Sequence, residues 1–402
     1  MATLSVEAGG TIVTSVLDRG NRIYSNEVVV PLFSVAEWLV TNWWHLWYEI
    51  EDTGEQRPEF ASRHNLAFAA DGFVLPSLTM TAASGPMQLR WAPYKPQHAR
   101  IEFVDGGSER VARDELETEF RNLIDAVIER LHGRPDTAPA ANNLARDWNA
   151  VNGLDADEIE FSRAAALLGL DPFDVQDDVA DGIVAFWART EPSLREDALA
   201  TASEHAQLPW LAAWFDGVLQ TLEAEEHGND WADVRRALPP ARPGLEPWTR
   251  GYTLAHATRE RVAANGGRFD FSPSGPLTIP HQPSQPPSTR IHGLVAAKTP
   301  ACVTVPRGQT GTRFLIARAL GEFLGRSTPG ASLLSSLSTD QQAQSRAFAA
   351  EFLAPAEVLR QRLARNDLEP DRADDLAQEF GVSSQLIRHQ VRNHDLATII
   401  DY

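Results

Sequence analysis

Proline-rich stretches set the strongest limit on how this chain can fold, because proline breaks both helices and sheets. Two of them, LPPARPGLEPW and FSPSGPLTIPHQPSQPPSTR, hold too many prolines for any regular element. A third, GRPDTAPAAN, has the composition of a linker. A chain of 402 residues is also too long for one ordinary core, so these breaks predict several packed units. The expected units are residues 1–132, 143–237 and 248–402.

The bulk composition is that of a folded, strongly acidic protein. Hydrophobic residues make up 43% of the chain and charged residues 23%, enough apolar material to offset the entropy of ordering. The formal charge of −19 repels phosphate backbones and anionic lipids, so nucleic-acid binding needs a local patch and membrane binding is not expected. The single Cys302 excludes an intramolecular disulfide, and no apolar run is long enough for a membrane span or a signal peptide. We therefore expect a soluble, cytoplasmic protein.

The N-terminal part of the chain predicts an α+β unit. A helix is expected after Ser34, which is placed to cap it, and a second helix from Asp114 to His132 repeats apolar residues at helical spacing. Segments that are β-branched or alternate in polarity predict strands, which interleave with these helices. The expected strands are Thr11–Leu17, Val28–Phe33, Met87–Trp91 and Arg100–Val104.

The rest of the chain is predicted to be mostly helical. Residues 143–237 contain helical patterns only, which indicates an all-α middle module. After the proline-rich loop from Ser272 to Arg290, a strand is expected at Ala301–Val305 and then four helices, the first two at Thr312–Arg326 and Thr339–Phe352. The fold class is therefore α+β and multidomain, with a small sheet in a mostly helical C-terminal unit.

Two of these C-terminal helices have distinctive sequences. The first reads RFLIARALGEFL, from Arg313 to Leu324, and the second contains SRAFAAEFLAP, from Ser345 to Pro355. A strand precedes the first helix, and a polar loop separates the two. This order of elements resembles the ImmA/IrrE family of bacterial metallopeptidases over roughly residues 248–400. The resemblance implies a zincin-like C-terminal fold.

The resemblance also implies that the family's zinc site is lost here. In that family the first helix carries His-Glu-x-x-His, whose histidines bind zinc while the glutamate activates a bound water, and the second helix supplies a glutamate ligand. The corresponding positions are occupied by Arg318, Ala319, Glu322 and Gln344. Guanidinium has no free lone pair and alanine exchanges no proton, so we expect no metal, no other cofactor and no peptidase activity.

Arg318 and Glu322 are four residues apart and therefore share one face of the helix. Our hypothesis is that they form an ion pair, with Gln344 nearby, in the space that zinc would fill. The alternative is an ordinary ion pair on a helix surface. None of the eleven histidines lies three or four residues from another, so a zinc site of two histidines on one helix is not expected elsewhere.

The C-terminal DLAQEFGVSSQLIRHQV has the spacing of a helix-turn-helix, with Ser383 as the cap of its second helix. In that arrangement Gln385, Arg388 and Arg392 are the candidate DNA contacts. The segment is nevertheless locally acidic, which disfavours binding to a phosphate backbone. In the resembled family a similar helical end packs on the peptidase core.

Two N-terminal features allow more than one interpretation. His64, Asn65 and Asp71 are polar residues that could line a pocket, although a lone histidine in such a stretch is more often a hydrogen-bonded core residue. An aromatic cluster could be a binding platform, but its spacing favours burial of most of its members. The cluster consists of Trp38, Trp43, Trp44, Trp47 and Tyr48.

The resemblance implies a catalytically inactive, metallopeptidase-like protein that binds or regulates another protein. Members of the resembled family often act on repressor-like or antitoxin-like partners in bacterial stress response, mobile-element control or phage defence. Two alternatives stay open. One is a DNA-binding transcriptional regulator that uses the C-terminal helices, and the other is an enzyme whose active site lies in the N-terminal unit.

Overall fold

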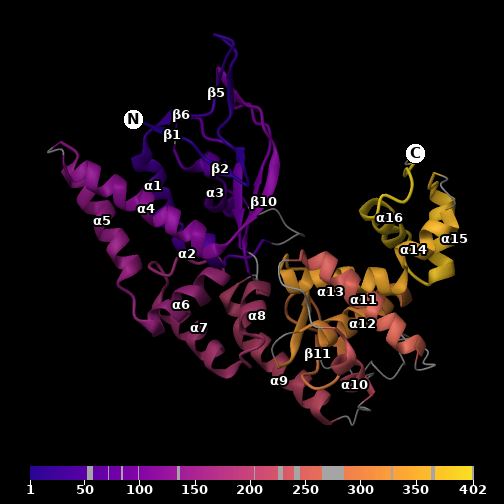
Figure 1. The fold of residues 1–402 in the computed structure, drawn as a ribbon. Coiled ribbons are helices and arrows are strands. Elements are labelled where there is room, and N and C mark those ends of the chain that lie inside the picture. The colour runs from indigo at the N-terminus through magenta and orange to yellow at the C-terminus, as the bar shows by residue number, and fades with distance from the viewer. Residues whose placement is uncertain are drawn as a thin grey trace. The chain divides into compact units, whose positions relative to one another are not determined.

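The chain divides into two compact units, Met1–Val184 (unit 1) and Ala185–Tyr402 (unit 2) (Figure 1). The helices expected as a middle module, 143–237, are shared between these units, and α7 (Asp177–Arg189) runs from one into the other. No helix within the described ranges is long and apolar enough to cross a membrane. The computed structural model describes residues 1–51, 58–70, 72–82, 85–97, 99–133, 136–202, 204–224, 230–239, 245–264, 285–326, 329–363 and 367–400.

The strands of unit 1 form short antiparallel sheets. β1 pairs with β6 and β2 with β3, while two three-stranded sheets have the orders β5-β4-β9 and β10-β8-β7. The strand predicted at Met87–Trp91 is confirmed as β8. The strands are β1 (Ala2–Leu4), β2 (Glu7–Ala8), β3 (Thr11–Ile12), β4 (Val16–Asp18), β5 (Ile23–Ser25), β6 (Val28–Val30), β7 (Leu78–Thr81), β8 (Met87–Trp91), β9 (Ile101–Phe103) and β10 (Gly107–Val111).

The single strand predicted over residues 11–17 is instead two short strands, β3 and β4. Thr14 lies between them and its side chain is fully buried. Its Oγ1 accepts a hydrogen bond from Val6 N at 3.0 Å and donates one to Asn26 O at 2.8 Å. Because these bonds tie the chain to two other segments, the extended run is interrupted at this residue.

The aromatic cluster is the centre of the unit 1 core. Trp38 belongs to α1 (Leu32–Thr41), while Trp43, Trp44 and Trp47 belong to α2 (Trp43–Tyr48), and all four are buried. Their burial confirms that most of the cluster is core. The predicted cap at Ser34 is wrong, because α1 begins at Leu32, directly after Pro31, and no side chain caps it. The other helices of unit 1 are α3 (Pro58–His64), a 3₁₀ turn (Leu66–Phe68), α4 (Arg113–His132), α5 (Ala138–Asn152) and α6 (Ala156–Leu167).

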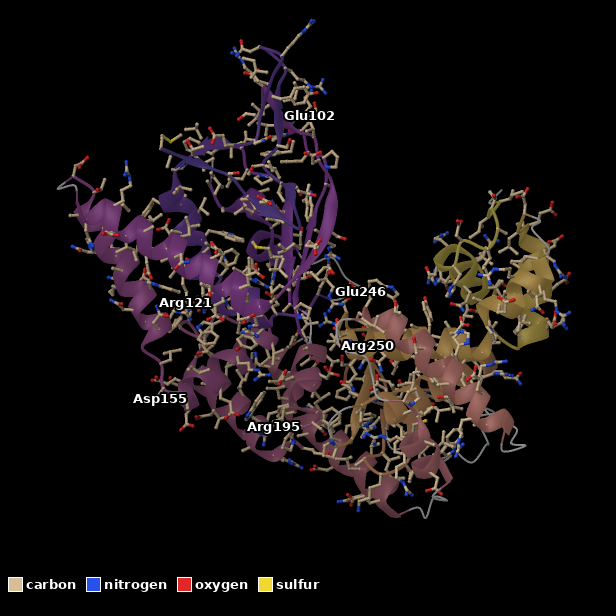
Figure 2. All side chains as sticks on the ribbon, viewed as in Figure 1. Glu102, Arg121, Asp155, Arg195, Glu246 and Arg250 are labelled. Atoms are coloured by element: carbon tan, nitrogen blue, oxygen red, sulfur yellow. The ribbon has the colours of Figure 1, made fainter. Side chains whose placement is uncertain are left out.

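The linker predicted at 133–142 is wrong in its second half, because α5 begins at Ala138. Proline is tolerated in the first turn of a helix, where its missing N–H costs no hydrogen bond. Trp148 of α5 is buried, meets Trp43 edge to face at 4.8 Å between ring centroids, and donates from Nε1 to Asp125 at 2.8 Å. Arg121 of α4, labelled in Figure 2, lies over both rings. These contacts join α5 to the unit 1 core.

Unit 2 consists of helices around one small sheet. The sheet has the antiparallel order β12-β11-β13, and α12 packs against all three strands and against α13 (Figure 1). The strands are β11 (Ile291–Val295), β12 (Cys302–Thr304) and β13 (Ser332–Ser335). The helices are α8 (Arg195–Thr201), a 3₁₀ turn (His205–Gln207), α9 (Leu208–Ala224), α10 (Asp230–Ala237), α11 (Pro247–Ala264), α12 (Gln309–Gly325), α13 (Asp340–Leu353), α14 (Ala356–Leu363), α15 (Pro370–Phe380) and α16 (Ser384–Asn393).

Two glycines allow three helices of unit 2 to approach one another closely. A Cβ on Gly321 of α12 would lie 2.7 Å from the ring of Phe348 on α13. A Cβ on Gly251 of α11 would lie 2.4 Å from the backbone oxygen of Gln344, also on α13. Any larger residue at either position would push the helices apart, so α13 packs directly on the backbone of α11 at Gly251 and of α12 at Gly321. The loop predicted from Ser272 to Arg290 lies largely outside the described residues.

Candidate functional site

The central part of α12 is buried and carries two charged side chains. Arg318 and Glu322 are each 2% exposed, and every residue from Leu315 to Leu324 is buried. Charged side chains at such depth are rare unless they are paired or hydrogen-bonded. The interpretation of this pair as an ordinary surface ion pair is therefore wrong. We call Arg318, Glu322, Gln341, Gln342 and Ser345 the α12–α13 polar cluster.

The guanidinium of Arg318 is held by neighbours from α13 and β13. Nη2 donates to Gln342 Oε1 at 2.5 Å and to the backbone oxygen of Ser335 at 3.1 Å. Nε donates to Ser345 Oγ at 3.4 Å, and Nη1 lies 3.4 Å from His292 Nδ1. Burial, together with the neighbouring charge of Arg346, lowers the pKa of Arg318 to about 9. Arg318 is thus cationic at neutral pH, in a position fixed by its hydrogen bonds.

Glu322 lies in the same interior but makes fewer hydrogen bonds. Its Oε2 accepts a hydrogen bond from Gln341 Nε2 at 2.6 Å, whereas its Oε1 is buried without a partner in the described part of the chain. Burial raises the pKa of Glu322 to about 7, although Gln341 and the charge of Arg318 both oppose this rise. The carboxyl group is therefore partly protonated at neutral pH.

The direct ion pair that the spacing predicts is not found among the described residues. Arg318 directs its donors to Ser335, Gln342 and Ser345. None of its nitrogens lies within the ion-pair distance of 4.0 Å from the carboxylate oxygens of Glu322. The two charges still act on each other through space, since each shifts the pKa of the other toward its ionised form. The acceptors of Arg318 are all uncharged groups, so its guanidinium is hydrogen-bonded without direct contact to a buried carboxylate.

Gln342, and not Gln344, is the residue of α13 that faces Arg318. Gln342 is fully buried, and its Nε2 donates to Leu333 O at 2.6 Å and to Asp197 Oδ2 at 3.3 Å. Gln344 lies against the end of α12 instead, because a Cβ on Gly325 would lie 2.3 Å from its Nε2. The sequence signal for this was helical spacing: Gln341 and Gln342 lie four and three residues before Ser345 and share its face.

Ala319, which lies between Arg318 and Glu322 in the sequence, is fully buried in the apolar core of unit 2. A methyl group there offers no base for proton transfer. The described residues contain no group of three or more His, Cys, Asp or Glu side chains arranged to hold a metal ion. Cys302 is buried as well, and burial raises the pKa of its thiol to about 12, so it is not a thiolate nucleophile. As arranged, the cluster positions one cation and one titratable carboxyl group inside the unit.

The C-terminal helices have the geometry that the sequence predicts. Gly381 ends α15 with a φ of 63°, and Ser383 caps α16 by accepting a hydrogen bond from Leu386 N at 3.2 Å. Gln385 and Arg392 are exposed, and Arg388 is half-buried. α15 also exposes carboxylates at Asp371, Asp374, Asp375 and Glu379.

The N-terminal candidate residues are largely structural. His64 is fully buried, with Nδ1 2.8 Å from Met80 O and Nε2 3.2 Å from Glu49 Oε2. Asn65 caps the 3₁₀ turn by accepting from Ala67 N, and Asp71 lies outside the described residues. With both ring nitrogens of His64 occupied, nothing here supports a catalytic base.

Glu49 is a buried, charged residue of unit 1 that the sequence did not mark as a candidate. It is 4% exposed, accepts a hydrogen bond from Arg63 Nε at 2.7 Å, and lies 3.2 Å from both His45 Nδ1 and His64 Nε2. Burial alone would raise its pKa, but the close contacts with His45, His64 and Arg63 outweigh burial and hold the pKa well below its usual range. This carboxylate is fully satisfied and supports the core.

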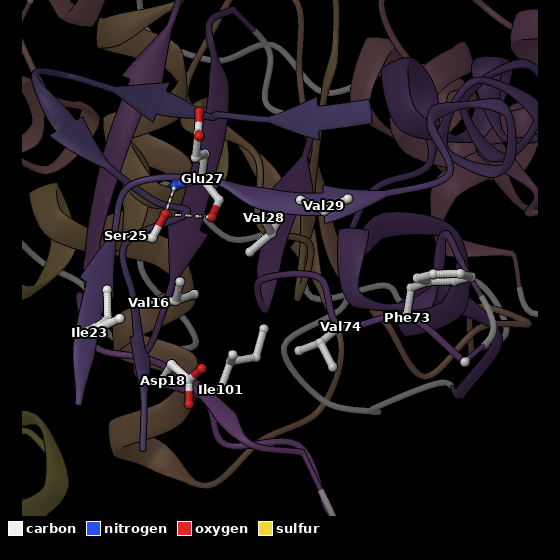
Figure 3. Close-up of a pocket in the computed structure, with 11 residues that line it drawn as sticks. Val16, Asp18, Ile23, Ser25, Glu27, Val28, Val29, Phe73, Val74 and Ile101 are labelled. Atoms are coloured by element: carbon white, nitrogen blue, oxygen red, sulfur yellow. Dashed lines mark hydrogen bonds between the residues drawn. The ribbon is translucent and has the colours of Figure 1, made fainter. Parts of the chain in front are cut away.

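A second feature of unit 1 is an apolar pocket of about 440 Å³ (Figure 3). It lies between β4, β5, β6, β9 and the segment from Gly72 to Val74. Ile23, Val29 and Phe73 on its wall are 59%, 61% and 39% exposed, so the wall presents several apolar side chains to solvent in one place. Asp18 and Glu27 are its two acidic members. The pocket is therefore lined mainly by apolar side chains, with two carboxylates on its wall.

Comparison with known proteins finds no match to this chain among family models, curated proteins or solved structures.

Proposed function

We propose that this chain is a non-catalytic binding or regulatory protein whose C-terminal unit is similar to the ImmA/IrrE metallopeptidases. One observation supports this most: Arg318, which the resemblance aligns with the first zinc-binding histidine, is a buried and hydrogen-bonded guanidinium. A guanidinium offers no lone pair to a metal, and its charge repels a divalent cation. With Ala319 at the position of the general base, neither part of the hydrolytic chemistry has a residue to perform it.

The apolar pocket of unit 1 supports the binding role. Contiguous exposed apolar surface on a folded protein commonly marks a contact site for another molecule. Ile23, Val29 and Phe73 together provide such a surface. The proposed partner is a protein, and the proposed setting is the bacterial cytoplasm, in stress response, mobile-element control or phage defence. That setting rests on the family resemblance.

The proposal is tested by returning the zinc-site residues to the chain. The variant Arg318→His, Ala319→Glu, Glu322→His, Gln342→Glu supplies two histidines, a base and a third ligand at the positions that face one another. Equilibrium dialysis followed by elemental analysis should find no zinc on the natural chain and stoichiometric zinc on this variant. A matched control carries Gln344→Glu in place of Gln342→Glu and should bind zinc far more weakly, because Gln342 hydrogen-bonds Arg318 directly whereas Gln344 lies against Gly325 at the end of α12.

Two zinc-binding results would reject the proposal. One is stoichiometric zinc on the natural chain that disappears with Glu322→Ala. The other is a four-residue variant that keeps the natural circular dichroism spectrum and still binds no zinc, since a metallopeptidase-like geometry should accept the metal once its ligands are present. Peptidase activity of the natural chain on unfolded protein substrates would likewise contradict it.

A DNA-binding regulator is the second candidate, favoured by the cap of Ser383 and the left-handed turn at Gly381, which give α15 and α16 a helix-turn-helix geometry. The exposed carboxylates of α15 oppose it. A mobility-shift assay at graded salt, with the natural chain and the variant Arg388→Ala, Arg392→Ala, decides between the two. A salt-dependent shift that this variant abolishes would establish the regulator.

A further inference from the structure

Unit 2 contains a pocket of about 500 Å³ that lies apart from the α12–α13 polar cluster. Its walls come from α11, α12, α13 and α16, and its volume is in the range of sites for small molecules, roughly 300–1,000 Å³. Neither Arg318 nor Glu322 lines it. The pocket therefore belongs to none of the positions that the peptidase resemblance marks.

The walls of this pocket are fixed by polar contacts. Gln390 of α16 is fully buried, and its Nε2 donates to Glu351 Oε2 at 2.9 Å and to Ala354 O at 3.0 Å. The ring of Tyr252 on α11 lies 4.6 Å from that of His394, which follows α16. These contacts hold α16 against α11 and α13 without any ligand, so the pocket is largely preformed.

The side chains on the pocket wall combine aromatic surface with positive charge. Trp248, Tyr252 and Phe314 supply three aromatic rings, and Trp248 is 47% exposed. Arg346 is the wall's permanent cation, and His389 adds a ring with nitrogen donors. No Asp or Glu is found among the described residues that line the pocket, although the whole chain has a formal charge of −19. A pocket free of carboxylates in so acidic a protein favours an anion.

Arg346 has hydrogen-bonding capacity left for a ligand. Its Nη1 donates to Leu337 O at 3.1 Å. Its Nε and Nη2 make no hydrogen bond to the described residues. A guanidinium edge with free donors matches the two oxygens of a carboxylate. The aromatic rings can pack on a flat apolar body attached to that carboxylate.

We propose that this pocket binds a small aromatic carboxylate, with the acid group on Arg346 and the ring against Trp248, Tyr252 and Phe314. The ligand lies between α16 and the three core helices, so its binding tightens the attachment of α16. This site includes none of the positions that the resemblance assigns to zinc.

The test uses naphthalene-2-carboxylate as the probe and the full chain as the protein. Isothermal titration calorimetry should detect binding of the carboxylate, while 2-naphthalenemethanol should bind about tenfold more weakly and 2-naphthylmethylamine not at all. Arg346→Gln should weaken the carboxylate about tenfold and leave the alcohol unchanged, whereas Trp248→Ala should weaken both. The matched controls are Arg360→Gln on α14 and Trp210→Ala on α9, which lie outside the pocket and should change neither affinity.

Several results would overturn the proposal. Absence of carboxylate binding at millimolar probe would do so, as would equal affinity for the amine. Equal affinity of the carboxylate for the natural chain and for Arg346→Gln would show that the probe does not bind at Arg346. Because the comparison of the three probes is made on the natural chain, the charge preference is measured even if a variant fails to fold.

Discussion

Gln390 on α16 donates a hydrogen bond to Glu351 on α13 at 2.9 Å, and both side chains are fully buried. Glu351 also accepts from the backbone nitrogen of Ala356, at the first residue of α14. The carboxylate of Glu351 therefore holds two helices against α13. It binds the first residue of α14 at the end of α13 and the side chain of Gln390 on α16. His256 Nε2 lies 3.1 Å from the same carboxylate and adds α11.

Glu351→Ala should therefore loosen the C-terminal helices specifically. The change leaves one N–H of Gln390 and the backbone N–H of Ala356 without an acceptor, which should lower the free energy of unfolding of unit 2 by about 3 kcal/mol. Hydrogen exchange should speed up most in α14 and α16. Glu357→Ala, which removes an exposed carboxylate next to Arg360, is the control and should have little effect. Unchanged protection of the α16 amides would show that Glu351 does not hold that helix.

Glu322→Gln should stabilise unit 2 at alkaline pH. The pKa of Glu322 is raised from 4.5 to about 7 in the folded chain, so the folded state binds the proton more tightly than the unfolded state does. The free energy of unfolding consequently falls as pH rises from about 4.5 to 7, by about 3 kcal/mol in total, and stays low above that. Glutamine mimics the protonated form and avoids this loss.

The measurement is denaturant unfolding of the natural chain and Glu322→Gln at pH 5 and pH 8. We expect similar stabilities at pH 5 and a clear advantage for the variant at pH 8, with Glu357→Gln showing no such difference. A variant that is less stable than the natural chain at pH 8 would mean that the ionised carboxylate is needed by Arg318.

Glu49→Gln should have the opposite pH dependence in unit 1. Its pKa is held below the usual range in the folded state, so ionisation of Glu49 contributes stability above the unfolded pKa of about 4.5. That contribution is lost as pH falls below 4.5, by about 1.4 kcal/mol per pH unit. The variant should cost about 3 kcal/mol at pH 7, because Arg63 keeps its charge without its partner, and less at pH 3.

Hydrogen exchange of the amides in α1 and α2 reports on unit 1 separately from unit 2, which matters because two units need not unfold together. Glu51→Gln, which alters the more exposed pair with Arg90, is the control and should show little change at either pH. A penalty for Glu49→Gln that is the same at pH 3 and pH 7 would contradict the assignment.

The local elements of this fold follow well from the sequence. The helix predicted from Asp114 to His132 is α4, which begins one residue earlier, and the helix predicted at Thr339–Phe352 is α13, with Thr339 as its cap. Apolar residues at helical spacing and a capping side chain are both local signals, and each lies within one turn of the residues that it fixes. The multidomain α+β class could be predicted for the same reason.

The contacts between distant residues could not be predicted in this way. Gln342 meets Arg318 across two helices, and only the rotation of α13 about its axis, set by the close approach at Gly321 and Gly251, brings Gln342 inward in place of Gln344. The partners of Glu49 lie up to fifteen residues away on another helix. A single sequence does not specify such rotations, because they depend on the packing of complete elements.

Trp148→Ala tests whether α5 is part of the unit 1 core or the linker that its composition indicated. The indole is buried, meets Trp43, and donates to Asp125, so its removal leaves a large cavity and an unpaired acceptor. We expect a loss of about 3–5 kcal/mol in the free energy of unfolding of unit 1. Trp210→Ala removes an indole that is 73% exposed on α9 and should cost little. Denaturant unfolding followed by hydrogen exchange in α2 measures both, and equal small losses for the two variants would mean that α5 is only loosely attached to the core.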